Sequence, residues 1–140
     1  MGASIQPRTS SAPAAVKAKG FHVILDIAGV PAQVCEDDKG ILDLLVRAAT
    51  EAGTNVINSC RYHFGHNSPP GCTCFVMLDE SHISAHSYAD LGLLAIDVFT
   101  CGDTAESKAD VITEIICKWL PDVDIRVSRL PRFVLPPGGA

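Results

Sequence analysis

Four strand-like segments follow one another between residues 54 and 100, and the links that join them are too short to contain a helix. They cover residues 54–64, 74–78, 82–86 and 93–100. A turn rich in Pro and Gly, at residues 67–71, separates the first two segments. Strands joined by short links pair antiparallel, because parallel pairing needs a long crossover. The succession therefore predicts an antiparallel sheet.

Two segments with helical periodicity flank this run of strands. The first covers residues 40–52 and is followed by Gly53, a natural helix stop. Its apolar stripe consists of Ile41, Leu44, Leu45, Ala48 and Ala52. The second begins after Asp103 or Thr104, either of which can cap it, and ends before Pro121. Its apolar stripe consists of Ile112, Ile115, Ile116 and Trp119.

Two further strands complete the pattern. One covers residues 21–27, and the other is indicated by the alternating residues Val123, Ile125 and Val127. Each helical segment has one apolar stripe, so both can cover the same face of the sheet. The sequence therefore predicts an α+β fold, a two-layer sandwich in which an antiparallel sheet carries helices on one face.

The length of 140 residues fits one domain, which we expect at residues 20–130. We expect a disordered tail at residues 1–19, for which a targeting peptide is an alternative interpretation, and a loose tail at residues 131–140. No apolar run approaches the roughly 20 residues of a membrane helix. The first 20 residues also lack the apolar core of a secretory signal. We therefore expect a cytoplasmic protein that does not bind membranes and keeps its six cysteines as free thiols.

The formal net charge of -5 argues against binding to nucleic acid, because the Lys and Arg residues are scattered and form no basic patch. An acidic protein is compatible with a cationic small-molecule substrate. No pair of cysteines has the spacing of a zinc ribbon, so we expect no metal.

Residues 78–102 concentrate groups that can do chemistry. They include the hydroxyl of Ser81 and the imidazoles of His82 and His86. In an extended strand Ser81 points to one face and both histidines point to the other, so a Ser–His pair does not follow from regular geometry. The sequence contains no Gly-x-Ser-x-Gly motif. On these residues alone, a functional site and a structural role both remain open.

The same segment resembles the processing site of the small bacterial and archaeal S-adenosylmethionine decarboxylases. Its first block reads Glu-Ser-His-Ile-Ser-Ala-His at residues 80–86, and its second block reads Asp-Val-Phe-Thr-Cys-Gly at residues 97–102. A Gly-x-His-x-x-x-Asp element and an adjacent His-Phe pair also match, at Gly20, His22, Asp26, His63 and Phe64. The resemblance extends over roughly residues 20–120.

The resemblance implies that the chain cuts itself between Glu80 and Ser81. Ser81 Oγ would attack the carbonyl carbon of Glu80, and elimination followed by hydrolysis would leave a pyruvoyl group at residue 81. His86 stands at the position of the family's processing base, and an imidazole suits that task near neutral pH. The products would be an 80-residue β chain and a 60-residue α chain. The cofactor would be this pyruvoyl group, with neither a metal nor pyridoxal phosphate.

The resemblance also implies the activity. The family converts S-adenosylmethionine to S-adenosylmethioninamine and CO2 for spermidine biosynthesis. The pyruvoyl carbonyl would form a Schiff base with the substrate amine and accept the electrons that the departing CO2 leaves. Cys101 matches the family's proton donor. The family forms homodimers, so we expect a homodimer of processed αβ protomers with active sites near the subunit interface.

The sequence departs from the family's motif mainly near the substrate. Tyr88 and Asp90 stand where the family has Trp and Glu, and Thr73 replaces a serine that assists processing. We expect Phe64 and Tyr88 to offer aromatic faces to the substrate and Asp90 to accept from its ribose hydroxyls. A pyruvoyl-dependent ornithine or arginine decarboxylase on the same scaffold is the alternative. A non-catalytic paralogue acting as a binding or regulatory subunit is a third hypothesis, but it predicts loss of the processing and catalytic residues, which are all present.

Overall fold

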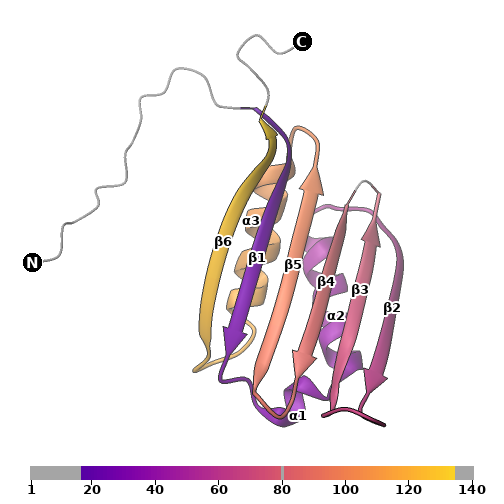
Figure 1. The fold of residues 1–140 in the computed structure, drawn as a ribbon. Coiled ribbons are helices and arrows are strands. Elements are labelled where there is room, and N and C mark those ends of the chain that lie inside the picture. The colour runs from indigo at the N-terminus through magenta and orange to yellow at the C-terminus, as the bar shows by residue number, and fades with distance from the viewer. Residues whose placement is uncertain (1–16, 80, 135–140) are drawn as a thin grey trace, which may run out of the picture.

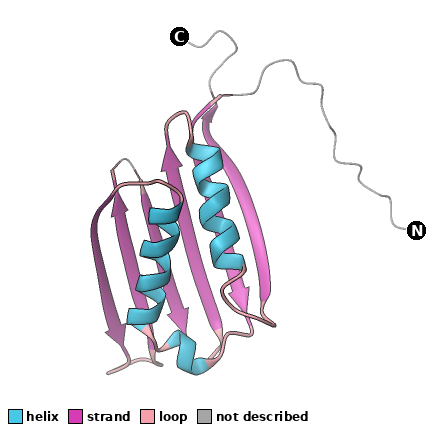
Figure 2. Ribbon diagram, turned by 180° about the vertical axis from the view of Figure 1, so that it is seen from behind, coloured by secondary structure: helices cyan, strands magenta, loops and turns pink. Residues whose placement is uncertain are grey.

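The computed structural model describes residues 17–79 and 81–134, and these residues form a six-stranded sheet with helices on one face (Figures 1 and 2). In chain order the elements are β1 (Ala18–Ala28), α1 (Ala32–Cys35), α2 (Asp38–Glu51), β2 (Val56–Phe64), β3 (Gly71–Leu78), β4 (His82–Tyr88), β5 (Leu93–Cys101), α3 (Ala105–Cys117) and β6 (Asp124–Val134). The predicted α+β two-layer sandwich is confirmed. In the described part of the chain, no helix is long and apolar enough to cross a membrane.

The sheet has the strand order β2-β3-β4-β5-β1-β6, and every neighbouring pair is antiparallel. Strands β2 to β5 form the predicted meander. β1 then lies between β5 and β6, so the links through α2 and through α3 both cross the helix-covered face (Figure 2). This topology brings the start of β4 and the end of β5 to the same end of the sheet, where His82 pairs with Phe99.

The core fills the space between the sheet and the helices. Each inner strand alternates, so that every second side chain is buried against α2 or α3. The buried strand residues include Val23, Leu25, Val76, Ile83, Ile96 and Val98, and the helices contribute Ile41, Leu45, Ala48, Ala109, Ile112 and Ile116. The predicted stripe of α2 is confirmed, with Ala52 only partly buried.

The opposite face of the sheet carries no helix from the described residues (Figure 1). We call it the open face. Strand alternation and register place several large exposed side chains on it, namely Tyr62, Met77, Tyr88, Leu93 and Leu130. Tyr62 retains 64% of its accessible surface. Such an apolar face is unusual for a surface in contact with water alone.

The predicted boundary residues of the domain need correction. β1 begins at Ala18 rather than near residue 20, and β6 extends to Val134 rather than ending near residue 130. The two strands pair along their whole length, from Ala28 with Asp124 to Ala18 with Val134, so each extends the other. Pro131 is tolerated because β6 is an edge strand. The tails expected at residues 1–16 and 135–140 lie outside the described residues.

Candidate active site

Ser81 closes the hairpin between β3 and β4. The Leu78 amide donates to the Ser81 carbonyl at 2.9 Å, and the Ser81 amide donates to the Leu78 carbonyl at 3.4 Å. The Asp79 amide is also held, by the Asn55 carbonyl at 3.1 Å. These bonds fix Ser81 in a half-buried position directly before β4. Glu80, the other partner in the expected cleavage, lies outside the described residues.

Cys101 is the last residue of β5 and lies at the same end of the sheet as Ser81. Its neighbour Gly102 donates an amide hydrogen bond to the Lys19 carbonyl at 3.0 Å. Gly102 has a φ of 93°, a conformation that residues other than glycine rarely adopt, and it turns the chain towards α3. Cys101 is half-buried at this end of β5.

Ser81 and Cys101 line one cavity of about 190 Å³. Its other walls are Gly53, Thr54, Asn55, Leu78, Asp79 and Lys108. The wall therefore combines the link from α2 to β2, the β3–β4 hairpin, the end of β5 and the first half of α3. Sequence reasoning missed Asn55, Asp79 and Lys108. Lys108 did carry a signal, since it stands four residues before Ile112 and extends the apolar stripe of α3 with a charge.

His86 lies away from this cavity. It pairs with Thr73 across β3 and β4, and its Nδ1 is 3.0 Å from Thr73 Oγ1. His86 is exposed on the open face, five residues from Ser81, which corresponds to roughly 17 Å along an extended strand. Within one protomer, the structure brings the two expected processing residues His86 and Thr73 together but keeps them apart from Ser81.

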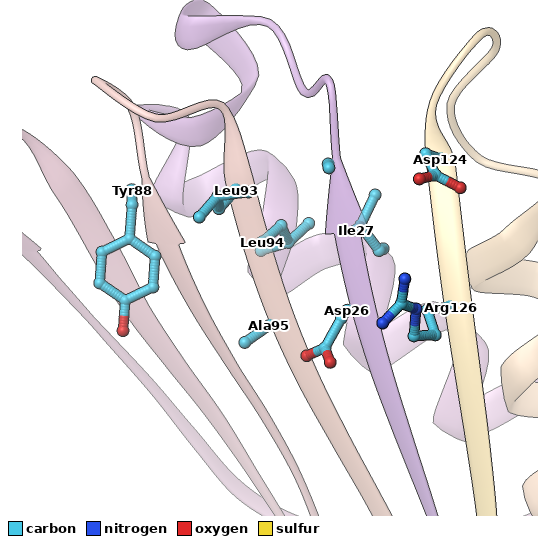
Figure 3. A pocket seen from close by; sticks show the side chains of 9 residues that line it. Asp26, Ile27, Tyr88, Leu93, Leu94, Ala95, Asp124 and Arg126 are labelled. Atoms are coloured by element: carbon cyan, nitrogen blue, oxygen red, sulfur yellow. The ribbon is translucent and has the colours of Figure 1, made fainter.

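The three expected substrate-binding residues lie at the opposite end of the sheet from Ser81. Phe64 ends β2, Tyr88 ends β4, and Asp90 is exposed in the turn that follows. Tyr88 borders a second cavity of about 250 Å³, together with Asp26 and Arg126 (Figure 3).

The adjacent residues His63 and Phe64 point to opposite faces of β2. His63 faces α2, with its Nδ1 3.8 Å from Asp38 Oδ1. Phe64 packs over Gly71, its partner on β3. Only Phe64 of this pair therefore borders the open face.

An aromatic row crosses the open face beside Ser81. The imidazole of His82 stacks on Phe75 at a centroid distance of 5.7 Å and also contacts Phe99 at 5.9 Å. Burial lowers the pKa of His82, and the nearby His22 adds to this effect while Asp97 opposes it. His82 is therefore a neutral, packed imidazole near pH 7.

His22 continues the row on β1. Arg132 donates a hydrogen bond to His22 Nδ1 at 3.2 Å, so the proton of a neutral His22 is on Nε2. That nitrogen lies 3.7 Å from Asp97 Oδ1. The motif positions His22 and His82 thus belong to one polar and aromatic row rather than to the cavity of Ser81.

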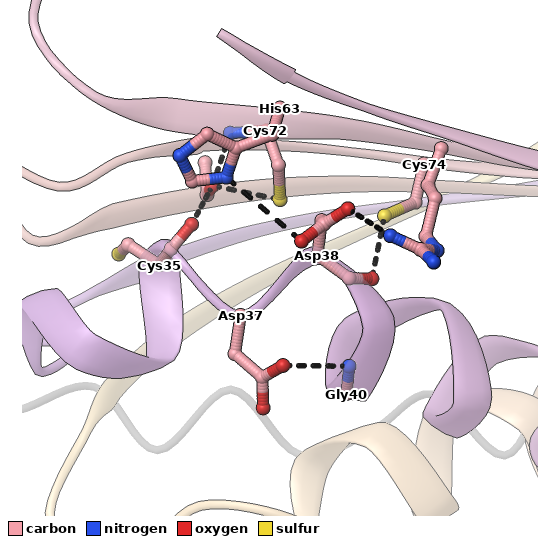
Figure 4. A network of polar contacts seen from close by, with 9 residues as sticks. Cys35, Asp37, Asp38, Gly40, His63, Cys72 and Cys74 are labelled. Carbon is pink, nitrogen blue, oxygen red and sulfur yellow. Dashed lines mark hydrogen bonds and ion pairs between the residues drawn. The ribbon is translucent and has the colours of Figure 1, made fainter. Parts of the chain in front are cut away.

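A buried thiol cluster lies under the other end of β3 (Figure 4). Ser87 Oγ donates to the Cys35 carbonyl at 2.5 Å and accepts from the Cys72 amide at 2.9 Å. A hydrogen bond with Cys72 and burial both raise the pKa of Cys74. The prediction of free thiols is confirmed for all six cysteines, and this cluster packs as part of the core.

Comparisons with known proteins agree on one family. The sequence profile described as S-adenosylmethionine decarboxylase matches residues 21–133. The S-adenosylmethionine decarboxylase proenzyme of Methanococcus maripaludis is 37% identical over 123 residues, which cover 88% of this chain and 97% of that protein. The proenzyme of Moorella thermoacetica is 30% identical over 126 residues, which cover 87% and 94%. The crystal structure of the adenosylmethionine decarboxylase from Aquifex aeolicus is similar with a TM-score of 0.65 and 32% identity, over 86% of this chain and 95% of that chain.

Proposed function

The chain belongs to the S-adenosylmethionine decarboxylase family, and on that basis we propose that it converts S-adenosylmethionine to S-adenosylmethioninamine and CO2 with a pyruvoyl group made from its own Ser81. One observation carries the proposal. Ser81 of the β3–β4 hairpin and Cys101 at the end of β5, which this chemistry needs close together, line the same cavity. The family match spans both residues.

Self-cleavage would take place at the β3–β4 hairpin. Ser81 Oγ attacks the carbonyl carbon of Glu80, and the C–N bond of that peptide breaks, so an ester replaces the amide. Removal of the α-proton of Ser81 then expels the Glu80 carboxylate and leaves dehydroalanine. Water displaces its nitrogen as ammonia, and the pyruvoyl group remains. The hairpin hydrogen bonds that hold Ser81 in a half-buried position support this assignment.

The pyruvoyl group, once formed, supplies the carbonyl that binds the substrate amine and accepts the electron pair released with CO2. The α-carbon of the substrate must then receive a proton. Cys101 lines the cavity from the end of β5 and is our candidate for this donor. The remaining walls, from the α2–β2 link and α3, would limit the access of water.

One protomer does not supply the base for self-cleavage from its own chain. A general base must lie within hydrogen-bond reach of the proton it removes, whereas His86 is roughly 17 Å along β4 from Ser81. We therefore assign this role to His86 of a second copy, supported by Thr73, its hydrogen-bond partner. A two-fold pairing of open faces is the simplest arrangement, because it also covers the exposed side chains on that face.

The same pairing accounts for the substrate-binding residues. Two open faces can pack with the strands of one protomer running opposite to those of the other. The strand ends that carry Phe64, Tyr88 and Asp90 of one protomer then meet the Ser81 end of the other. The two aromatic rings would then offer faces to the adenine and the sulfonium. Asp90 would accept hydrogen bonds from the ribose hydroxyls.

The test follows both products of the proposed chemistry. Purified chain is incubated, its intact mass is measured, and CO2 release is scored in parallel with labelled S-adenosylmethionine, arginine and ornithine. We expect fragments of 80 and 60 residues and release of CO2 from S-adenosylmethionine alone. Borohydride should attach that substrate to the smaller fragment. An uncut chain, or CO2 released from arginine or ornithine instead, would overturn the proposal.

A further inference from the structure

The cavity of Ser81 and Cys101 contains a cation that neither cleavage nor proton donation uses. Lys108 lies one turn into α3 and is half-buried. α3 starts three residues after Gly102, so its first turns return over the end of β5. Spacings of four and seven residues put Lys108 on the same side of the helix as Ile112 and Ile115, which faces the sheet. Lys108 therefore lines the cavity from the first turns of α3.

The described lining of this cavity contains two charged side chains. Among the described residues that line it, Lys108 is the single cation and Asp79 the single anion. Neither side chain forms an ion pair or a side-chain hydrogen bond with another described residue. An α-amino acid presents one ammonium and one carboxylate on the same carbon. The ammonium of Lys108, beside the reacting residues, offers that carboxylate a charge of the opposite sign.

We propose that Lys108 binds the α-carboxylate of the substrate, an assignment that rests on the proposed function. An ammonium is a compact charge with three donors, which suits a carboxylate that can arrive in more than one orientation. The contact exists only while the carboxylate is present. Once CO2 has left, the product has no group for Lys108, so the same residue that favours substrate binding no longer holds the product.

The expected kinetic signature is a split between substrate and product. Removing the ammonium should raise KM for S-adenosylmethionine by roughly tenfold to a hundredfold, the usual worth of a hydrogen bond to a charged group. It should leave kcat within a few-fold, because the carboxylate is still attached in the transition state, so the contact stabilises the bound substrate and the transition state alike. The inhibition constant of S-adenosylmethioninamine should stay unchanged. A purely structural role would weaken substrate and product binding together.

The test compares Lys108→Met with Lys118→Met, a control directly after the last turn of the same helix, where the exposed Lys118 pairs with Glu114. For both variants we would measure cleavage by intact mass, kcat and KM for S-adenosylmethionine, and inhibition by the product. Lys108→Arg keeps the charge and should recover much of the lost affinity. Equal losses for substrate and product, or an unchanged KM in Lys108→Met, would overturn the assignment.

A second measurement does not depend on the variant folding or cleaving. The α-carboxamide analogue of S-adenosylmethionine fills the same volume without the negative charge. In the wild-type enzyme it should bind no more tightly than the product, and binding as tight as that of the substrate would contradict a carboxylate contact. A folded but uncut Lys108→Met chain would assign Lys108 to cleavage instead. A wild-type chain that neither cleaves nor decarboxylates would overturn the proposed function and this assignment together, whereas an active wild type with an unchanged variant overturns the assignment alone.

Discussion

Ser81 and Cys101 share a cavity but are assigned to different steps, so single substitutions should separate cleavage from turnover. Ser81→Ala removes the attacking oxygen, and the chain should remain one uncut species that borohydride does not label. Intact mass measures both. Ser84→Ala removes a half-buried serine on β4 outside the cavity; it is the control and should cleave normally. Cleavage of Ser81→Ala at the same bond would exclude Ser81 as the nucleophile.

Cys101→Ala should show the opposite behaviour. Its chain should still cut, at least in part, because the thiol is not needed for the ester step. Release of CO2 from S-adenosylmethionine should fall by about a hundredfold or more, since a positioned proton donor is worth that much. Cys117→Ala removes another half-buried thiol, on α3, and should keep normal turnover. Normal kcat in Cys101→Ala would remove its assigned role.

His82 gives a pH prediction that does not depend on catalysis. Because burial lowers its pKa in the folded chain, the unfolded chain takes up the proton first as the pH falls through about 6.5. The free energy of unfolding should therefore decrease below that pH and be independent of His82 above it. His82→Phe keeps a ring between Phe75 and Phe99 but cannot be protonated, so urea unfolding between pH 5 and 8 should show a smaller decrease. The exposed His66→Ala is the control, and an identical decrease in His82→Phe would contradict the argument.

At the residue scale, the catalytic candidates that the sequence predicted lie within one continuous segment, residues 78–102. Ser81, His86 and Cys101 became candidates because two motif blocks stand close together in the chain. Asp79 and Lys108 were missed, because their common cavity forms only when a hairpin and a helix meet at one edge of the sheet. Strand alternation and strand length already predicted that His86 and Ser81 are separated. The strand register was needed to show that His86 lies beside Thr73 instead.

At the scale of elements, a glycine lets β3 and β4 approach each other closely at the start of β3. A Cβ built on Gly71 would clash with the Ser87 carbonyl on β4 and lie 2.7 Å from the ring of Phe64. Gly71→Ala must therefore push β3 away from β4 or displace Phe64, and we expect a loss of about 1–3 kcal/mol in the free energy of unfolding. Chemical denaturation measures the loss. A variant as stable as the wild type would mean that the strands lie further apart than the structure has them.

Periodicity and link length were enough to predict most elements. The meander from β2 to β5 followed from short links, and both long helices followed from their apolar stripes. The place of β1 between β5 and β6 did not follow, because a strand with long connections can join either edge of a sheet. α1 was missed, since a helix of four residues has too few turns to show a periodicity.

For the whole molecule, the asymmetry of the two faces matters most. The helix-covered face buries the core, whereas the open face exposes large apolar side chains beside His86 and Thr73. A monomer would leave this face in water and the Ser81 cavity without its base. Pairing of two open faces removes both deficits at once, which is why we expect the active species to be a dimer.

This expectation can be tested by mixing two inactive chains. Ser81→Ala lacks the nucleophile and His86→Ala lacks the base, so each alone should remain uncut. In a mixed dimer the His86→Ala chain supplies Ser81, and its partner supplies His86, so one of the two sites is complete. Random pairing makes about half of the dimers mixed, and activity should recover to about a quarter of the wild-type value. Only the His86→Ala chain should be cut, which a mass tag on one chain would reveal. Ser81→Ala mixed with Cys101→Ala is the control. It should release no more CO2 than Cys101→Ala alone, because Ser81 and Cys101 line one cavity of the same protomer. An uncut His86→Ala chain in the mixture, despite mixed dimers shown by light scattering and tag capture, would place the processing base within one protomer and contradict the shared site.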